Sequence, residues 1–294
     1  MVDSATISRQ RTIHRQRLLA LLVLLGAALI LLGLFAYPWA DISGTPVVDV
    51  PLVGMGDDEA TLGSVQVALQ DFIHQPRVSL GLFLAVGPER KTMIQDAVDG
   101  LTLRYTARDA AEVFIGQRDV LEVTGIQGVI DLLAEVDIPI PGANFTVDGA
   151  DLRQGLDEQA PPRAGVSGWD YTLFLIPVAA ALAVPVGLAQ LIRPSRRGWI
   201  LGLILGLLAL LPLLHFFNNV DTLVPTGDGL SLIGRIIHIP PVTQLVTTGF
   251  WLTLAGVGLL LLPALLALLA APARRASHGL VNRYHHRDRA SGAA

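Results

Sequence analysis

The residues that could ligate a cation are few and poorly spaced for that task, and none could act as a thiol nucleophile. Asp57, Asp58 and Glu59 lie together, but the Asp-x-Asp-x-Asp-Gly spacing of a calcium loop is absent. A helix start explains these acids better, because carboxylates there accept backbone N–H groups. The chain contains no cysteine, which excludes thiol chemistry and cysteine-bound metal centres. We therefore predict no metal site and no cofactor.

Other catalytic groups give an equally weak signal. The chain has no Gly-x-Ser-x-Gly motif, and His74 is the only histidine in residues 38–168. His278, His285 and His286 lie among arginines near the C-terminus, where we expect lipid contact rather than metal binding. Because triads assemble from distant positions, a membrane-anchored enzyme stays open as an alternative. The favoured prediction is a protein without catalytic residues.

Four apolar stretches are long enough to cross a bilayer, which needs about 20 residues in a helix. They are residues 18–37, 171–192, 199–217 and 250–271, and none contains Asp, Glu, Lys or Arg. Charges inside a membrane usually line ion and substrate pathways, so their absence argues against a proton-coupled transporter, a pump or an intramembrane protease. The first stretch exceeds the apolar core of a signal peptide and lacks a small-residue cleavage site, so we expect a retained anchor.

Arginines mark one side of the predicted membrane. With four spans, the tail 1–17, the turn 193–198 and the tail 272–294 all fall on the same side, which the positive-inside rule assigns to the cytoplasm. We expect the arginines of these segments to fix the topology and to contact anionic lipid headgroups. They include Arg15, Arg17, Arg193, Arg196, Arg197, Arg274 and Arg275.

The opposite side receives residues 38–170 and the loop 218–249. Residues 38–168 carry twenty Asp or Glu against eight Arg or Lys, whereas the whole chain has a net charge of only −4. An acidic surface does not neutralise phosphate, so nucleic acid is excluded as a partner. The predicted partners are the lipid bilayer and a protein in the membrane or outside it.

The inserted region is predicted to fold as an α+β domain. Apolar residues recur at helical spacing over 62–73 and again over 126–136, which predicts two amphipathic helices. Strict alternation over 78–86 and 101–107 predicts buried strands, and residues 112–124 resemble a hairpin. Polar residues 148–168 are expected to tether the domain to the second span.

Small and aromatic residues indicate how the spans pack and where they end. Gly198, Gly202 and Gly206 recur every fourth residue, which predicts a flat stripe for close contact with another helix. That contact could lie within one chain or between two copies. The four tryptophans lie at predicted span ends, where indole rings favour the headgroup level. They are Trp39, Trp169, Trp199 and Trp251.

The loop 218–249 contains an apolar segment, LSLIGRIIHIPP. We expect Ile236, Ile237 and Ile239 to be shielded by the membrane surface or by the outer domain. The alternative is that these three isoleucines form a patch that binds a partner.

The order of elements resembles that of ABC permeases of the cell-division and macrolide-exporter type. The resemblance implies an accessory or permease-like role in transport. Those permeases dock an ATPase through a helix between their second and third spans, however, and the six residues of 193–198 are too few for it. The sequence therefore predicts a four-helix membrane bundle that presents an extracytoplasmic domain for partner binding, scaffolding or assembly, with the transport subunit and the anchored enzyme as alternatives.

Overall fold

The structure is a computed structural model that describes residues 4–48, 60–133, 138–139, 146–147, 167–225 and 235–290. Side chains are described for residues 14–48, 60–132, 167–225 and 235–269. The chain divides into two units. Unit 1 comprises residues 1–32, 174–213 and 252–294, and unit 2 comprises residues 33–173 and 214–251.

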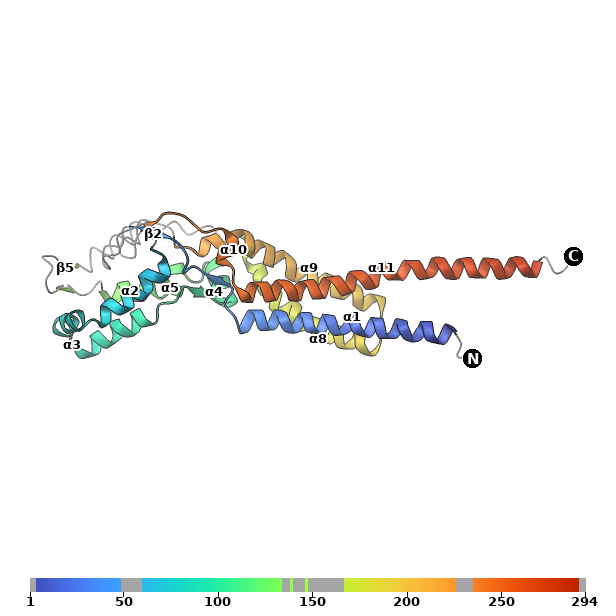
Figure 1. Ribbon diagram of the computed structural model, residues 1–294, viewed down its shortest axis with the longest axis horizontal. Coiled ribbons are helices and arrows are strands. Elements are labelled where there is room, and N and C mark those ends of the chain that lie inside the picture. Colours follow the sequence, from blue (N-terminus) through green and yellow to red (C-terminus); the bar gives the residue numbers. More distant parts are fainter. Residues whose placement is uncertain are drawn as a thin grey trace. The chain divides into compact units, whose positions relative to one another are not determined.

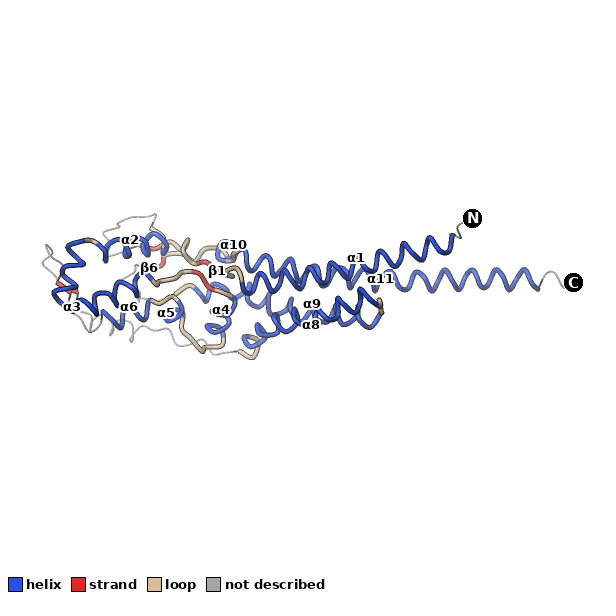
Figure 2. The backbone as a smooth tube through the Cα atoms, turned by 90° about the horizontal axis from the view of Figure 1, so that it is seen from below, coloured by secondary structure: helices blue, strands red, loops and turns tan. Residues whose placement is uncertain are grey.

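Helices dominate both units (Figures 1 and 2). The helices are α1 (Ser4–Phe35), α2 (Leu62–His74), α3 (Pro76–Asp99), α4 (Ala107–Phe114), α5 (Val120–Val123), α6 (Ile126–Leu133), η1 (Asp170–Phe174), α8 (Leu175–Ile192), α9 (Arg196–Asn219), η2 (Val220–Leu223), α10 (Val242–Leu245) and α11 (Thr248–Ala290). The strands are two residues long: β1 (Ala40–Asp41), β2 (Val47–Val48), β3 (Arg104–Tyr105), β4 (Ile138–Pro139), β5 (Thr146–Val147) and β6 (Arg235–Ile236). They form the antiparallel pairs β1–β3, β2–β6 and β4–β5.

Unit 1 is a bundle formed by α1, α8, α9 and α11, which pack through glycines. A Cβ atom on Gly26 of α1 would lie 2.7 Å from the carbonyl oxygen of Gly256 in α11, so these two backbones are in close contact. On Gly187 of α8, a Cβ would lie 2.7 Å from Leu24 Cδ2 of α1. The same four helices contain the stretches that are long and apolar enough to cross a membrane, namely His14–Phe35, Asp170–Ile192, Arg196–Leu223 and Thr248–Leu269.

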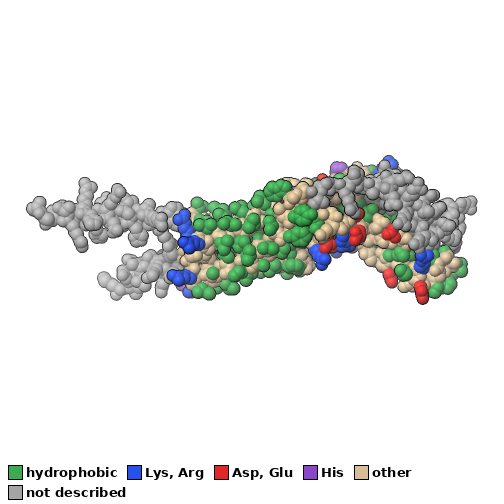
Figure 3. All heavy atoms as spheres, turned by 180° about the vertical axis from the view of Figure 1, so that it is seen from behind, with side chains coloured by type: hydrophobic (Ala, Val, Ile, Leu, Met, Phe, Trp, Pro, Cys, Tyr) green, Lys and Arg blue, Asp and Glu red, His purple; other side chains and the backbone are tan. Residues whose placement is uncertain are grey.

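The outer surface of the bundle has many exposed apolar side chains, and the face drawn in Figure 3 is largely apolar. Leu21, Leu25 and Leu32 of α1 and Leu262 and Leu265 of α11 are among its exposed side chains. Such a surface is stable in contact with hydrocarbon rather than water. The chain is therefore a multi-pass membrane protein whose four apolar helices contact the lipid bilayer.

Unit 2 has an apolar core between α2, α3 and α6. Its members are Ile73, Val78, Leu82, Ile94, Val98 and Val129. Gly87 has a φ of 78°, a conformation that favours glycine, and it divides α3 into two halves that fold onto the same core. Helix α2 begins with a capping box in which Thr61 Oγ1 accepts from the backbone N–H of Ser64.

Backbone hydrogen bonds join three distant segments of unit 2. The Trp39 N–H donates to the carbonyl oxygen of Tyr105 at 2.7 Å, and the Thr247 N–H donates to the carbonyl oxygen of Trp39 at 3.0 Å. The Trp39 ring packs edge-on against Phe216 and Phe250, with ring centroids 5.1 and 6.1 Å apart. We call this arrangement the Trp39 junction.

The predicted α+β fold of the inserted region is wrong, because most of its described residues are helical. Residues 78–86 form the first half of α3 instead of a strand, and residues 112–124 lie in α4 and α5 with the turn between them instead of a hairpin. Residues 101–107 contribute only the two-residue strand β3. The helices over 62–73 and from Ile126 onward are confirmed, whereas residues 134–137 and 148–166 lie outside the described residues.

Candidate functional site

The turn between α8 and α9 is held by a buried side-chain amide. Gln190 is 2% exposed; its Nε2 donates to the Ser195 carbonyl oxygen at 3.1 Å, and its Oε1 accepts from the Ser195 N–H at 2.8 Å. Ser195 Oγ accepts from the Gly198 N–H at 3.1 Å, as an N-cap residue does. These bonds fix the backbone that carries Arg193, Arg196 and Arg197.

The arginines of this end of unit 1 are exposed. Arg193, Arg196 and Arg197 project from the turn, and Arg15 and Arg17 from the start of the apolar part of α1. A cluster of exposed guanidinium groups beside an apolar surface can bind phosphate or carboxylate groups (Figure 3). Arg274 and Arg275 lie outside the described side chains.

The three glycines of α9 have different surroundings. Gln190 Nε2 occupies the space that a Cβ atom on Gly198 would need. On Gly202 a Cβ would lie 3.8 Å from Ala264 Cβ, an ordinary contact, whereas on Gly206 it would lie 2.5 Å from Leu261 Cδ2. Gly198 therefore makes room for the polar turn, and Gly206 for α11.

The four tryptophans fall into two pairs. Trp39 is 1% exposed and its indole N–H donates to the Gly33 carbonyl oxygen at 3.0 Å, while Trp199 is 4% exposed and its indole N–H has no partner among the described residues. Trp169 and Trp251 are about half exposed, at 57% and 45%. Only this second pair presents a large indole surface that could contact headgroups.

His215 and Asp170 connect α9 to η1 within unit 2. His215 Nε2 lies 2.8 Å from Asp170 Oδ1, and Asn219 Nδ2 lies 3.3 Å from His215 Nδ1. Asp170 Oδ2 also accepts from the Ser167 N–H at 2.6 Å. Both ring nitrogens of His215 therefore have partners, which suits a structural linker.

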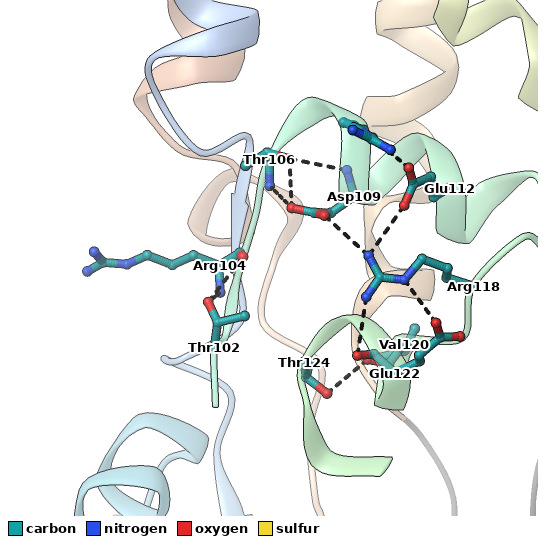
Figure 4. A network of polar contacts seen from close by, with 10 residues as sticks. Thr102, Arg104, Thr106, Asp109, Glu112, Arg118, Val120, Glu122 and Thr124 are labelled. Carbon is teal, nitrogen blue, oxygen red and sulfur yellow. Dashed lines mark hydrogen bonds and ion pairs between the residues drawn. The ribbon is translucent and has the colours of Figure 1, made fainter. Parts of the chain in front are cut away.

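Arg118 gathers three carboxylates between α4 and α5 (Figure 4). Its guanidinium lies 3.3 Å from Glu112 Oε2, 3.2 Å from Glu122 Oε1 and 3.8 Å from Asp109 Oδ1. Arg108 adds a second contact to Glu112 at 2.7 Å. The hydrogen bond from Arg108, followed by the one from Arg118, lowers the pKa of Glu112 below its ordinary value although burial opposes this. The network connects the short helices α4 and α5.

Two further ionisable groups in unit 2 have shifted pKa values. Burial tends to raise the pKa of Asp41, but hydrogen bonds from Ser43 and Arg104 outweigh it and hold that pKa below its ordinary value. Burial and the charge of Asp109 raise the pKa of Tyr105, whose hydroxyl donates to the Leu223 carbonyl oxygen at 3.0 Å. Both groups therefore have structural partners.

The apolar segment of the loop 218–249 is partly packed against the rest of unit 2. Ile236 lies in β6 and packs against Ile126 and Ile130 of α6. Ile237 is 54% exposed, and Ile239 is partly buried. Of the three isoleucines predicted as a patch, Ile237 presents the most surface.

A larger apolar face lies on α3, where the sequence predicted a buried strand. Leu80, Phe83 and Leu84 are 58%, 46% and 74% exposed, while Val78 and Leu82 on the opposite side are buried in the core. The spacing i, i+3, i+4 places the exposed residues on one side of the helix. The richness of this run in leucine, a good helix former, is the sequence signal that could have revealed the face.

Among the described residues, no group of three or more His, Asp or Glu could hold a metal ion. Asp57, Asp58 and Glu59 lie outside the described residues, as do the side chains of His278, His285 and His286. No family model, no curated protein and no solved structure matches the chain.

Proposed function

We propose that the protein is a membrane-anchored scaffold that binds another protein through its inserted helical region, without catalysing a reaction. The bundle anchors the chain in the cell membrane, with both termini in the cytoplasm and residues 38–170 outside. The observation that carries partner binding is the exposed apolar face of Leu80, Phe83 and Leu84, because isolated soluble surfaces rarely hold three neighbouring large apolar side chains on a fixed helix.

The charge distribution supports this orientation. Exposed arginines lie at the turn between α8 and α9 and at Arg15 and Arg17, which suits the cytoplasmic leaflet and its anionic lipids. The acidic residues 38–168 suit the opposite side. Only residues 193–195 separate α8 from α9, so the turn offers no helix for docking an ATPase.

Single-cysteine labelling tests the orientation, because the chain has no cysteine of its own. In intact cells, a maleimide that cannot cross the cell membrane should label Asp71→Cys. It should label His14→Cys only after the cell membrane is opened. Both positions are exposed. The reverse pattern would contradict the proposed orientation.

Isolation from native membranes tests partner binding. Extraction with a polymer that retains the surrounding lipid should yield a stoichiometric complex, either of several copies or with another protein. Recovery of single chains alone would contradict the scaffold. A protein bound through the face of α3 should be lost in Leu84→Lys, whereas the matched change Val67→Lys, at an exposed apolar position of α2, should retain it.

A further inference from the structure

The start of the apolar part of α1 and the turn between α8 and α9 lie at the same end of unit 1 (Figures 1 and 2). Helices α1 and α8 are in contact where a Cβ atom on Gly187 would lie 2.7 Å from Leu24 Cδ2. Arg17 is seven residues before Leu24, and Arg193 is six residues after Gly187. At 1.5 Å per residue, each arginine is about 10 Å from this contact, toward the same end of the bundle. We call the exposed arginines of this end the arginine cluster: Arg15, Arg17, Arg193, Arg196 and Arg197.

The arginine cluster has no carboxylate in the described part of its own unit. The described side chains of unit 1 are those of residues 14–32, 174–213 and 252–269, and none of them is Asp or Glu. In unit 2, by contrast, Arg104 lies 3.0 Å and Arg118 lies 3.3 Å from a carboxylate oxygen. Because like charges repel, the five guanidinium groups of the cluster favour anions from outside the chain.

Exposed apolar side chains adjoin the arginine cluster. Ile192, directly before Arg193, is 83% exposed, and Leu18, directly after Arg17, is 59% exposed. Figure 3 shows Lys and Arg side chains grouped at one end of the apolar surface. An anion that carries acyl chains can contact both kinds of side chain, whereas inorganic phosphate can contact only the arginines. This surface therefore suits a phospholipid better than a soluble anion.

The missing acids also determine which headgroup fits. A phosphatidylcholine headgroup brings a quaternary ammonium group together with its phosphate. That cation would lie among five guanidinium groups, with no Asp or Glu among the described side chains of unit 1 to neutralise it. A phosphatidylglycerol headgroup brings the phosphate charge alone, and arginine binds phosphate oxygens through two parallel hydrogen bonds. The cluster therefore favours a headgroup with a net negative charge.

The backbone that carries three of the five arginines is fixed before any lipid binds. Gln190 forms hydrogen bonds with both the N–H and the carbonyl oxygen of Ser195, at 2.8 and 3.1 Å. Ser195 Oγ accepts from the Gly198 N–H, at the start of α9. Binding energy is consequently not spent on ordering the turn.

We propose that the arginine cluster is a binding site for phospholipids whose headgroup has a net negative charge, such as phosphatidylglycerol. The phosphate accepts hydrogen bonds from guanidinium groups of α1 and of the turn, and the acyl chains lie along Leu18 and Ile192. The bound lipid neutralises the cluster and links the two elements. The site lies in unit 1 and not in the inserted region, so this role goes beyond the scaffold function and does not depend on it.

Thermal unfolding of the delipidated full chain in a nonionic detergent tests the site. Dioleoyl phosphatidylglycerol should raise the unfolding temperature by several degrees, because a ligand of the folded state stabilises it. The shift should shrink at about 1 M NaCl. Dioleoyl phosphatidylcholine has the same acyl chains, and inorganic phosphate is the soluble anion; neither should give this shift. An equal shift with either of them would overturn the proposal.

Arginine variants locate the site. Arg17→Gln combined with Arg193→Gln should reduce the shift several-fold. Arg77→Gln combined with Arg104→Gln removes the same charge from exposed side chains of unit 2 and should retain the shift. Equal shifts in the two double variants would overturn the site. Single purified chains give this readout, so its failure would leave the proposed scaffold function untouched.

Mass spectrometry of the intact wild-type chain gives a second measurement that needs no variant. With equal amounts of the two lipids present, the chain should retain phosphatidylglycerol several-fold more often than phosphatidylcholine. Equal retention of the two lipids would overturn the proposal even if Arg17→Gln with Arg193→Gln does not fold.

Discussion

The side-chain amide of Gln190 fills the space beside Gly198 that any larger residue would require. Gly198→Ala should therefore displace Gln190 from its bonds with Ser195 and leave a buried amide unsatisfied. The expected cost is about 1–3 kcal/mol, seen as a lower unfolding temperature in detergent. Gly202→Ala is the control, because its Cβ would meet only Ala264 at 3.8 Å. Equal stability of the two variants would refute this account of the turn.

The contact between α1 and α11 gives a second matched pair of glycines. A Cβ atom on residue 256 would lie 2.6 Å from the Gly26 carbonyl oxygen and 2.7 Å from Ile30 Cγ1. Gly256→Ala should force the helices apart and destabilise the bundle by about 1–3 kcal/mol or more. Gly258→Ala, which would meet nothing within 4 Å, should leave the unfolding temperature unchanged. Equal destabilisation by both changes would contradict the role of the contact, since alanine favours a helix more than glycine does.

Arg118 should stabilise unit 2 in a pH-dependent way. The change Arg118→Gln should lower the free energy of unfolding by about 1 kcal/mol at pH 7. The value is modest because the network is partly exposed. The pKa of Glu112 is lowered in the folded protein, so its ionised form contributes stability above its ordinary value of 4.5. That contribution disappears as the pH falls through the lowered pKa.

Thermal unfolding at several pH values measures this effect. The difference between the wild-type chain and Arg118→Gln should be largest near neutral pH and should shrink at acid pH. Lys91→Gln removes the same charge outside the network and serves as the control. A difference that grows on acidification would contradict the role of Glu112.

The bond between His215 and Asp170 should contribute to stability, because Asp170 is only 8% exposed. Asp170→Ala leaves His215 Nε2 and the Ser167 N–H without their acceptor, at a cost of about 1–3 kcal/mol. Asp71→Ala, a change of an exposed acid in α2, should cost little. Limited proteolysis near Ser167 should increase in Asp170→Ala only. An unchanged cleavage pattern would show that the bond does not hold η1.

The two buried tryptophans should respond differently to the same substitution. Trp39→Phe removes the donor to the Gly33 carbonyl oxygen and should lower stability by about 1 kcal/mol beyond the loss of ring volume. Trp199→Phe removes an N–H that has no partner among the described residues, so it should be tolerated better. Unfolding temperatures of the two variants, measured in the same detergent, compare these costs.

Hydropathy and helical periodicity predicted the parts of the fold that depend on local sequence. The four apolar helices each contain a long run without charge, and α2 combines a regular apolar spacing with a cap at Thr61. Helix α4 could have been found in the same way, because Thr106 and Asp109 form a capping box. The hairpin prediction gave more weight to the polar residues after Ile115 than to this signal.

The strand predicted over 78–86 is wrong, because the alternating apolar residues of this segment do not all face the same side. Alternating apolar residues would all point one way in a strand. In the helix they separate, with Val78 and Leu82 in the core and Leu80 and Leu84 exposed. Pro76 at the first turn, leucine-rich composition and the core contacts favour the helix.

The polar contacts could not be predicted, because each joins residues that the folded backbone brings together. Asp170 and His215 are 45 positions apart, and no spacing rule connects them. The link between Gln190 and Ser195 is closer in sequence, but it depends on how the turn leaves α8. Sequence patterns predict which segments are buried better than they predict which polar groups form hydrogen bonds with each other.

The Trp39 junction ties together residues that leave the ribosome at very different times. Pro38 and Thr247, which share a hydrogen bond there, are 209 positions apart. At about 5–20 residues per second, translation delays that bond by roughly 10–40 s after Pro38 is made. During this interval the indole of Trp39 is not yet fully buried. We therefore expect chains that terminate before Thr248 to be recognised and degraded by quality-control proteases.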